Sequence, residues 1–549
     1  MDFENMSKEE LIEYINNLNE EKSGKYGLVW DAEKVAEQVV VDCNKLIPVL
    51  KEEENKKINN GGEDNILIEG DNFHSLSVLN YTHKESIDVI YIDPPYNTGK
   101  EFIYNDNIVN EEDGYRHSKW LNFMSKRLKL ARNLLKETGI IFISINDIEF
   151  AQLKLLCDKI FGIQNYVSII TWQNLDSVKN DAKYFSTNTE YILVYAKNKL
   201  ELKIQGTKKG EKQISYYKNY DNDPRGAYLL TPLHAKSGSE SGKYEYIFSN
   251  GQIWSAPEGT YPRFSISTLK RLEEEGRLYL DPKCKKVPQK KTYLSEVGDR
   301  MPPITFWSAA EYGSTRQSNA ELATLVGKGK FQNPKPTKLI KKLIELVDNK
   351  NAIILDFFAG SGTTGQAVMD MNQEDNGSRK FILCTNNENN ICEEVTYQRI
   401  KTVITGNRKD NSKYSDGLPS SLKYFKTDFV ENNSTRDQIY FDLTEKCVPM
   451  LCVKESTFDL VEKTDSYVIY KDKNDINYTC IYFAIHHNHY NEFIEKIKLI
   501  ENKKALYIFS LDNRVEEYEL DGITNYKVEA IPQKIYDLYR KLVKLSKEN

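Results

Sequence analysis

The fold that this sequence predicts is decided by the stretch Ala352-Ile353-Ile354-Leu355-Asp356-Phe357-Phe358-Ala359-Gly360-Ser361-Gly362-Thr363-Thr364. It starts with an apolar segment of strand length, continues into a turn rich in glycine, and then opens a helix. Glycines allow a backbone to approach a ligand closely, and the N-terminus of a helix favours the negative charge of a carboxylate. The stretch therefore predicts a ligand site at the end of a strand in an α/β domain.

Strand-like and helical segments alternate on both sides of this stretch. The strand-like segments are 66–68, 87–92, 140–145, 166–172, 191–196 and 381–383, and the helical ones are 75–79, 120–135, 150–161 and 337–347. Such β-α-β alternation favours a mostly parallel, doubly wound sheet. From 197 to 307 the alternation gives way to a segment rich in Gly, Pro, Lys and Tyr, so we expect a large insertion that interrupts the α/β domain.

The same pattern predicts five regions along the chain. They are an N-terminal helical extension and linker at 1–64, the first half of the α/β domain at 65–196, the insertion at 197–307, the second half of the α/β domain at 308–430, and a C-terminal α+β domain at 431–549. The last region has strand-like segments of its own at 466–470, 478–483 and 505–509, and it ends in a helical segment at 533–544.

Composition excludes several classes of protein. The chain has 549 residues, of which 40% are hydrophobic and 11% aromatic, enough for packed cores rather than disorder. Its first residues are acidic and polar, and its apolar runs are far shorter than a membrane span, so we expect a cytoplasmic protein with no membrane partner. The eight cysteines form no C-x-x-C pair, which favours reduced, mostly buried thiols over a zinc knuckle or a disulfide framework.

Net charge and histidine content say less about which ligands the chain binds. The formal net charge of −6 does not by itself indicate a nucleic-acid binder, although 197–218 and 283–291 are locally basic. Taken alone, each basic stretch is more typical of a solvated face. The run His486-His487-Asn488-His489 could hold a metal ion, but no Cys or Asp at ligand spacing supports it, so we expect no metal site.

A second motif, Asp93-Pro94-Pro95-Tyr96, directly follows the strand-like segment 87–92. The amino group of adenine is a poor nucleophile because its lone pair is delocalised into the ring. The carboxylate of Asp93 and the backbone carbonyl of Pro94 can each accept one of its N–H groups, which localises the lone pair on nitrogen. The prolines stiffen the loop, and Tyr96 offers a ring on which an extruded base can stack. The alternative is an ordinary proline turn after a strand.

The glycine turn has two alternative interpretations. A nucleotide P-loop requires Lys after its last glycine, whereas Gln366 follows Gly365 here, so phosphate binding of that type is not expected. A dinucleotide fingerprint needs the spacing G-x-G-x-x-G, which Gly360, Gly362 and Gly365 satisfy. The sequence offers no hydride-transfer site to accompany it, and the motif at 93–96 would then have no role.

Together the two motifs resemble those of the amino-methyltransferases of DNA, in the permuted order of the β class, with the D-P-P-Y loop first and a long insertion before the glycine loop. Further stretches narrow the resemblance to the modification (Mod) subunits of Type III restriction–modification systems. These stretches are Lys25-Tyr26-Gly27-Leu28-Val29-Trp30, Asp93-Pro94-Pro95-Tyr96-Asn97-Thr98-Gly99, Asp223-Pro224-Arg225-Gly226, Asn333-Pro334-Lys335-Pro336 and Phe381-Ile382-Leu383-Cys384-Thr385-Asn386-Asn387-Glu388. The likeness covers nearly the whole chain.

The resemblance implies a fold and an activity. The fold would be a doubly wound, Rossmann-like methyltransferase sheet with an inserted target-recognition domain and a C-terminal α+β domain. The activity would be site-specific transfer of a methyl group from S-adenosylmethionine to the N6 amine of adenine in duplex DNA, with the base flipped out of the helix. Such a protein would be bacterial, cytoplasmic and associated with the nucleoid through its binding to DNA.

The resemblance also implies roles for single residues. Asp93, Pro94, Pro95 and Tyr96 would form the catalytic loop. The residues that would bind the cofactor are Asp71 near its adenine, Glu388 at its ribose hydroxyls, Lys335 and Pro336 at its methionine moiety, and Asp356, Phe358, Ala359, Gly360, Ser361, Gly362, Thr363 and Thr364 in the glycine loop. Phe357 stands where many β-class enzymes have proline, a departure that leaves the glycines intact.

By the same resemblance, the insertion at 197–307 would read the DNA sequence. Basic side chains would hold phosphates while polar and aromatic ones contact base edges. The candidate DNA-binding residues are Lys208, Lys209, Arg225, Lys285, Lys286 and Lys290, and Arg225 could instead form a structural ion pair. Members of this family are dimers, and the C-terminal region would meet a Type III restriction (Res) subunit.

Two other functions stay open at this point. The chain could methylate a different substrate, namely the N4 amine of cytosine, RNA or a protein amide. It could also be a specificity subunit that recognises DNA without chemistry, although both motifs are intact. Asp rather than Ser at the first position of the D-P-P-Y loop favours adenine over cytosine.

Overall fold

The computed structural model describes residues 28, 30, 37–43, 45–98, 115–177, 182–281, 283–432, 435–484, 489–512, 514–515 and 520–545. It divides into two compact units. The first contains Met1–Lys203 and Ile304–Asn549, and the second is Ile204–Pro303, which lies within the insertion expected at 197–307. The motif at 25–30 falls mostly outside the described residues. All eight cysteines are free, and all but Cys284 are buried.

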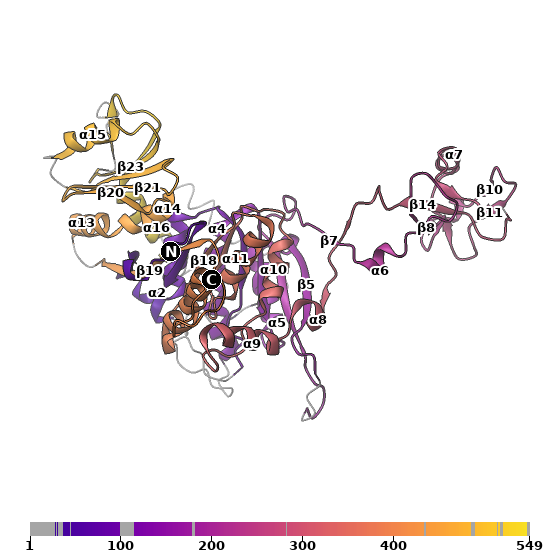
Figure 1. Ribbon diagram of the computed structural model, residues 1–549, viewed down its shortest axis with the longest axis horizontal. Coiled ribbons are helices and arrows are strands. Elements are labelled where there is room, and N and C mark those ends of the chain that lie inside the picture. The colour runs from indigo at the N-terminus through magenta and orange to yellow at the C-terminus, as the bar shows by residue number, and fades with distance from the viewer. Residues whose placement is uncertain are drawn as a thin grey trace, which may run out of the picture. The chain divides into compact units, whose positions relative to one another are not determined.

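The first unit is built on one ten-stranded sheet, in the order β1-β19-β2-β18-β17-β3-β4-β6-β5-β16 (Figure 1). Its strands are β1 (Leu46–Glu52), β2 (Glu63–Glu69), β3 (Ile87–Ile92), β4 (Leu135–Ile145), β5 (Tyr166–Gln173), β6 (Thr189–Ala196), β16 (Phe306–Trp307), β17 (Ile353–Asp356), β18 (Lys380–Thr385) and β19 (Ser420–Glu431). Every pairing from β19 to β4 is parallel, while β1 and β6 run antiparallel to their neighbours. The predicted doubly wound, mostly parallel sheet is therefore confirmed.

Helices cover both faces of this sheet, as its parallel strands require. They include α3 (Asn72–Thr82), α4 (Arg116–Leu134), α5 (Phe150–Phe161), α9 (Thr315–Val326), α10 (Thr337–Glu345), α11 (Thr363–Asp375) and α12 (Tyr397–Thr405). All six residues of β3 are buried, which explains why the strand is apolar except for Asp88 and shows no alternation of polar and apolar residues. Sequence patterns contained no such signal for β1 and β19, which extend the sheet beyond the predicted strands.

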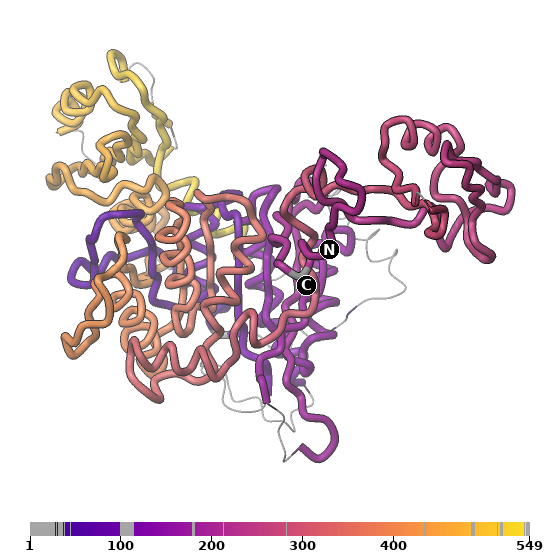
Figure 2. Tube along the Cα trace, turned by 45° about the vertical axis from the view of Figure 1, so that its right-hand side comes forward, coloured from indigo at the N-terminus to yellow at the C-terminus, as the bar shows by residue number. Residues whose placement is uncertain are grey.

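The decisive neighbours in the sheet are β17 and β3. They pair in parallel, with Ile354 opposite Val89 and Leu355 opposite Ile90. From β17 the chain passes through α11 to β18 on one side, and from β3 it passes through α4 to β4 on the other. The strand order therefore reverses between β17 and β3, and ligands of doubly wound sheets bind at such a switch point. Figure 2 shows the early and late parts of the chain interleaved in this one sheet.

The C-terminal region forms a five-stranded sheet in the order β20-β21-β22-β23-β24. Its elements are α13 (Arg436–Lys446), α14 (Val448–Glu455), β20 (Asp459–Lys463), β21 (Tyr467–Lys471), β22 (Asn477–Tyr482), α15 (Tyr490–Lys498), β23 (Lys503–Phe509), β24 (Tyr526–Ile531) and α16 (Gln533–Leu545). Its hydrophobic core is continuous with that of the ten-stranded sheet and its helices, because Leu451 and Ile535 belong to the same buried cluster as Leu76 and Leu79 of α3.

The second unit is small and made of short strands. Its main sheet joins β13 (Leu278–Tyr279), β14 (Gln289–Tyr293) and β8 (Tyr228–Pro232), and a nine-residue helix, α7 (Ile266–Glu274), begins at the N-cap Ser265. Its core consists of Leu233, Phe248, Trp254, Leu269, Leu272 and Leu278. Where the unit begins and ends, β7 (Thr207–Lys208) pairs with β15 (Arg300–Met301), which brings the two connecting segments together.

A buried ion pair stabilises the first unit near its N-terminal end. The guanidinium of Arg127 is fully buried, and its Nη2 and Nη1 atoms lie 2.6 and 3.1 Å from the two carboxylate oxygens of Glu37. Arg127 also donates to Asn72 and lies 3.3 Å from Asp71. A buried carboxylate that loses its partner is strongly destabilising, because its charge stays out of water without compensation.

We therefore expect Arg127→Met to lower the free energy of unfolding of the first unit by about 3–5 kcal/mol. Adding Glu37→Gln to this variant should recover at least half of the loss, since it removes the uncompensated charge. Urea denaturation of the three proteins measures both effects. Equal stabilities of the single and double variants would contradict this account.

Candidate active site

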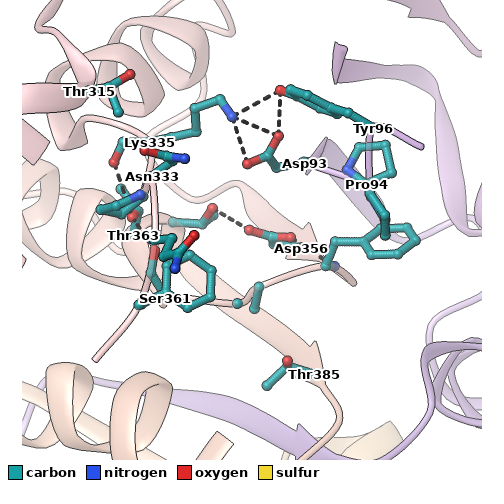
Figure 3. A pocket seen from close by; sticks show the side chains of 18 of the residues that line it. Asp93, Pro94, Tyr96, Thr315, Asn333, Lys335, Asp356, Ser361, Thr363 and Thr385 are labelled. Atoms are coloured by element: carbon teal, nitrogen blue, oxygen red, sulfur yellow. Dashed lines mark hydrogen bonds and ion pairs between the residues drawn. The ribbon is translucent and has the colours of Figure 1, made fainter. Parts of the chain in front are cut away.

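A cavity of about 570 Å³ lies at the carboxyl ends of β17 and β3 (Figure 3). It is lined by Asp93, Pro94, Pro95 and Tyr96 from one predicted motif and by Asp356, Phe358, Ala359, Gly360, Ser361, Thr363 and Thr364 from the other. The two motifs are far apart in the sequence, and the parallel pairing of their strands brings them to one site.

The loop that follows β3 is held by its neighbours at two points. The indole Nε1 of Trp120 donates to the carbonyl of Pro95 at 2.7 Å. Asn97 is buried with φ +53°, and its Nδ2 donates to Glu149 Oε1 at 2.5 Å. Among the described residues, no hydrogen bond is made to the carbonyl of Pro94. The anchors therefore fix the loop and leave this carbonyl as an acceptor for a ligand.

Lys335 binds the carboxylate of Asp93 directly. Its Nζ lies 2.8 and 2.7 Å from the two Asp93 oxygens and 3.0 Å from the hydroxyl of Tyr96. Glu190 of β6 completes the group, with its Oε2 at 3.4 Å from Lys335 Nζ. Burial lowers the pKa of the Lys335 ammonium, but the charges of Asp93 and Glu190 outweigh it and raise the pKa above its ordinary value. Lys335 is therefore a cation at neutral pH.

Tyr96 takes part in the same hydrogen-bond network. Its hydroxyl donates to Asp93 Oδ1 at 2.8 Å and lies 3.1 Å from Glu190 Oε2. Burial and the nearby charge of Asp93 raise the pKa of this phenol well above its usual range, so it keeps its proton. The stacking role predicted for Tyr96 stays a prediction, while its hydroxyl orients the carboxylate.

The glycine loop adopts backbone angles that need glycine. Gly360 has φ +44° and Gly362 has φ +74°, both in the left-handed region. A Cβ atom on Gly360 would lie 3.0 Å from the ring of Phe331, and one on Gly362 would lie 3.3 Å from Thr396. The loop is therefore closed on its outer side by Phe331, a cavity residue that the sequence patterns did not indicate.

Asp356 is buried beneath this loop. Its Oδ1 accepts from the backbone N–H of Phe358 at 3.0 Å, and its Oδ2 accepts from the hydroxyl of Thr364 at 2.6 Å. Burial raises the pKa of Asp356 to about 7, although both hydrogen bonds act in the opposite direction. The carboxyl group thus joins the end of β17 to the first turn of α11.

Arg399 supports the loop from behind and was not among the predicted residues. Its guanidinium is fully buried, with Nη1 at 2.7 Å from Thr363 Oγ1 and Nε at 2.8 Å from Gln366. Burial lowers its pKa to about 10, which still leaves it charged at neutral pH. The hydroxyl of Thr363 in turn donates to the backbone carbonyl of Lys335 at 3.2 Å. Lys335 therefore contacts the catalytic loop through its side chain and the glycine loop through its carbonyl.

Four predicted cofactor residues do not line the cavity, namely Asp71, Pro336, Gly362 and Glu388. Asp71 caps α3 by accepting from the N–H of Phe73 at 2.7 Å, and Pro336 precedes α10 as its N-cap. The cavity wall at the end of β18 and beyond it consists of Thr385, Asn386 and Ile391. The roles assigned to these four residues stay predictions.

Comparison with known proteins identifies the family. A family model described as DNA methylase matches residues 87–397. The StyLTI Mod subunit, a Type III restriction-modification enzyme of Salmonella typhimurium, is 32% identical over 468 residues, which cover 78% of this chain and 70% of that protein. The EcoPI Mod subunit of Escherichia phage P1 is 32% identical over 69% of this chain and 67% of its own. This chain belongs to the Type III Mod family of DNA methylases.

Among solved structures, the putative DNA modification methylase TTHA0409 of Thermus thermophilus, complexed with S-adenosyl-L-methionine, is similar to this methylase. It shares 13% identity over 61% of this chain and 96% of its own, with a TM-score of 0.30. That overlap is too slight to bear on the geometry of the site.

The cavity of the methylase fits S-adenosylmethionine, the methyl donor of a DNA methylase. A volume of about 570 Å³ is ample for a nucleoside carrying an amino acid. Gly360 presents bare backbone to the cavity, and the N-terminus of α11 at Thr363 favours a carboxylate. The acidic side chains of Asp93, Asp356 and Glu190 suit a ligand with a positively charged centre.

The candidate DNA-binding residues differ in their surroundings. Arg225 makes a bidentate ion pair with Asp223, at 2.9 and 2.8 Å, and donates to the carbonyls of Glu275 and Gly276. This is the structural ion pair that the sequence left as its alternative. The lysines Lys208, Lys285 and Lys286 are exposed, Lys209 donates to the carbonyl of Gly298 at 2.5 Å, and the Nζ of Lys290 lies 5.6 Å from the ring centre of Phe264.

The described part of the methylase contains no group of three or more His, Cys, Asp or Glu side chains arranged to hold a metal ion. His489 lies 3.2 Å from Glu492, whereas His486 and His487 fall outside the described residues. No helix in the described ranges is long and apolar enough to cross a membrane.

The raised pKa of Asp356 predicts a pH dependence of stability. Between about pH 4 and about pH 7 the folded chain keeps this proton while the unfolded chain has released it, so a rise in pH through this window favours unfolding. The stability of the wild type relative to Asp356→Asn should therefore fall by up to about 1.4 kcal/mol per pH unit there, and level off above pH 7.

Urea denaturation at about pH 5, 6 and 7 measures this slope. Asp416→Asn is the control, because the Asp416 side chain is 94% exposed, and its difference from the wild type should stay constant in this window. A constant difference for Asp356→Asn as well would show that Asp356 is already ionised at pH 5.

Proposed function

We propose that this methylase transfers a methyl group to the N6 amine of adenine in duplex DNA, with the target base flipped into the cavity between the two loops. The observation that carries the proposal is the pair of acceptors at 93 and 94. An oriented carboxylate on Asp93 and a carbonyl on Pro94 with no partner among the described residues line the same cavity as the glycine loop.

The hydrogen bonds around Asp93 leave it one useful lone pair. Among the described residues, Oδ1 accepts from Tyr96 and Lys335, and Oδ2 accepts from Lys335 alone. A carboxylate oxygen can accept two hydrogen bonds, so Oδ2 retains one position for an N–H of the substrate. The Pro94 carbonyl can accept the other N–H. Two acceptors on one amino group withdraw its hydrogens from the ring plane and localise the nitrogen lone pair.

The residues of the chain then divide the remaining tasks. Bound S-adenosylmethionine supplies an electrophilic methyl group on a positively charged sulfur. Lys335 and Tyr96 keep the Asp93 carboxylate fixed while the nitrogen forms its new bond to carbon. The proton that the nitrogen loses passes to Asp93 Oδ2. Once the donor methyl group lies in line with an oriented amine, the transfer needs little further catalysis from the protein.

Adenine is favoured over the N4 amine of cytosine because the loop begins with Asp93 rather than Ser. A flipped base also needs a pocket, and the cavity extends from the glycine loop past Tyr96 to Asn174 and Leu175. RNA and protein amides are the other substrates that a test should include.

Three wider roles belong to the same proposal. The insertion at 197–307 would read the DNA sequence, the methylase would act as a homodimer, and its C-terminal region would meet a restriction subunit. Support for the last comes from the likeness to Mod subunits of Type III restriction-modification enzymes. The homodimer stays a prediction from the sequence. A place in the cytoplasm likewise stays a prediction.

Asp93→Asn should reduce methylation by at least about a hundredfold, because an amide presents one acceptor oxygen and cannot take the proton. Binding of S-adenosylhomocysteine, the uncharged product, should stay within about threefold, since the glycine loop is untouched. Labelled methyl transfer to plasmid DNA, followed by nucleoside analysis for N6-methyladenine, and calorimetric titration provide the two readouts. Methylation of RNA or protein in place of DNA by the wild type would refute the proposal.

Replacing Lys285, Lys286 and Lys290 together by Ala should weaken DNA binding and reduce its dependence on salt. Each phosphate contact that is lost lowers the slope of log affinity against log salt by about 1, so three contacts would lower it by about 3. Fluorescence anisotropy with a short duplex at several salt concentrations measures the slope. The control replaces the exposed lysines Lys463, Lys503 and Lys541 of the C-terminal region. Equal slopes for the two triple variants would exclude these insertion lysines from the DNA interface.

A further inference from the structure

Glu190 belongs to neither motif, yet its carboxylate lines the cavity. It is the second residue of β6, where it pairs with Trp172 of β5, and its side chain is 17% exposed. Asn174 Nδ2 donates to its Oε1 at 2.8 Å, and its Oε2 lies 3.1 Å from the hydroxyl of Tyr96. These contacts hold the carboxylate in one orientation next to the catalytic loop.

Acidic side chains outnumber basic ones in the described lining of the cavity. Lys335 is the only basic residue among its described lining, and it faces two carboxylates. Both oxygens of Asp93 lie within 2.8 Å of its Nζ, whereas Glu190 is 3.4 Å away. The ammonium therefore neutralises Asp93, to which it is bound (Figure 3). The charge of Glu190 then stays in excess. Asp356, the third acid of the lining, adds negative charge whenever it is ionised.

An excess negative charge distinguishes the two forms of the cofactor. S-adenosylmethionine carries a positive sulfonium, and S-adenosylhomocysteine, the product, carries a neutral thioether. They differ by one methyl group and one unit of charge. A fixed carboxylate on a largely buried side chain attracts the first and is indifferent to the charge of the second. The attraction therefore acts before methyl transfer and is absent after it.

We propose that Glu190 is a specificity-determining residue that makes this cavity prefer S-adenosylmethionine over S-adenosylhomocysteine, and so favours release of the product. The inference rests on the proposed function, because it places the donor in this cavity. Lys335 takes part by neutralising Asp93, which leaves the charge of Glu190 available to attract a sulfonium that would be bound in the cavity. The effect is on binding, and it does not require Glu190 to touch the reacting atoms.

The test is the ratio of the two dissociation constants, product over donor, measured by calorimetric titration of the full chain. In Glu190→Gln, which keeps the shape of the side chain, the ratio should fall about tenfold, equivalent to about 1.4 kcal/mol. The fall should come from the donor, with the product bound within about twofold of the wild type. Sinefungin, which has an amine cation in place of the sulfonium, should follow the donor. An unchanged ratio, or equal weakening of donor and product, would overturn the proposal.

A matched control separates charge from shape. Asn174→Ala removes the 2.8 Å hydrogen bond to Glu190 and keeps its charge, so the ratio should stay within about twofold of the wild type. A fall as large as that in Glu190→Gln would contradict the proposal, because loss of orientation would then suffice to explain the effect.

A second variant tests the same preference for the donor if Glu190→Gln does not fold. Thr315 lines the cavity from the first position of α9, where an acidic side chain is well tolerated by the helix. Thr315→Asp adds a carboxylate from another element and should raise the ratio, and an unchanged ratio would overturn the proposal. The proposed function and this inference would fail in different experiments. The proposed function is refuted if the wild type binds neither ligand or does not methylate adenine. Only this inference is refuted if the wild type binds both ligands and methylates adenine, but the ratio does not depend on position 190.

Discussion

The structure depends on the parallel pairing of β17 with β3. Two residue pairs, Ile354 with Val89 and Leu355 with Ile90, place the ends of these strands side by side. The loop after each strand then borders the same cavity, because parallel strands end at the same edge of a sheet. The connections that follow lead to β18 on one side and to β4 on the other, which opens the space between the loops. Without this pairing, the catalytic loop and the glycine loop would be two unrelated turns.

The ion pair between Lys335 and Asp93 ties the two halves of the chain a second time. Lys335 comes from the segment before α10, and its ammonium binds a carboxylate from the first half of the chain. Its carbonyl accepts from Thr363 in the glycine loop. A single residue thus sets the separation between an oriented acceptor and the site expected for the donor. The same ion pair determines which carboxylate keeps a net negative charge. Because the ammonium of Lys335 neutralises Asp93, the negative charge of Glu190 stays in excess.

Sequence patterns could find the strands of the sheet interior because these strands are mostly apolar and lack the spacing of amphipathic helices. They did not indicate β1 and β19, whose residues mix charged and apolar types, nor the shared core between α3 and the C-terminal region. In the site, residues within the two motifs were predictable, since glycine and proline constrain the backbone locally. Glu190, Arg399 and Phe331 were not, because each reaches the cavity or its loops from another element, and only the folded chain brings them there.

By itself, the sequence determined the fold class, the two loops and the family of chemistry, because strand periodicity and a few special backbone residues act locally. The tertiary structure alone decided which polar groups are partners. It placed Lys335 on Asp93 rather than free in the cavity, and Arg127 on Glu37 rather than in solvent. The physical reason is that an ion pair depends on distances of a few ångströms between residues far apart along the chain, and such distances are fixed only by packing.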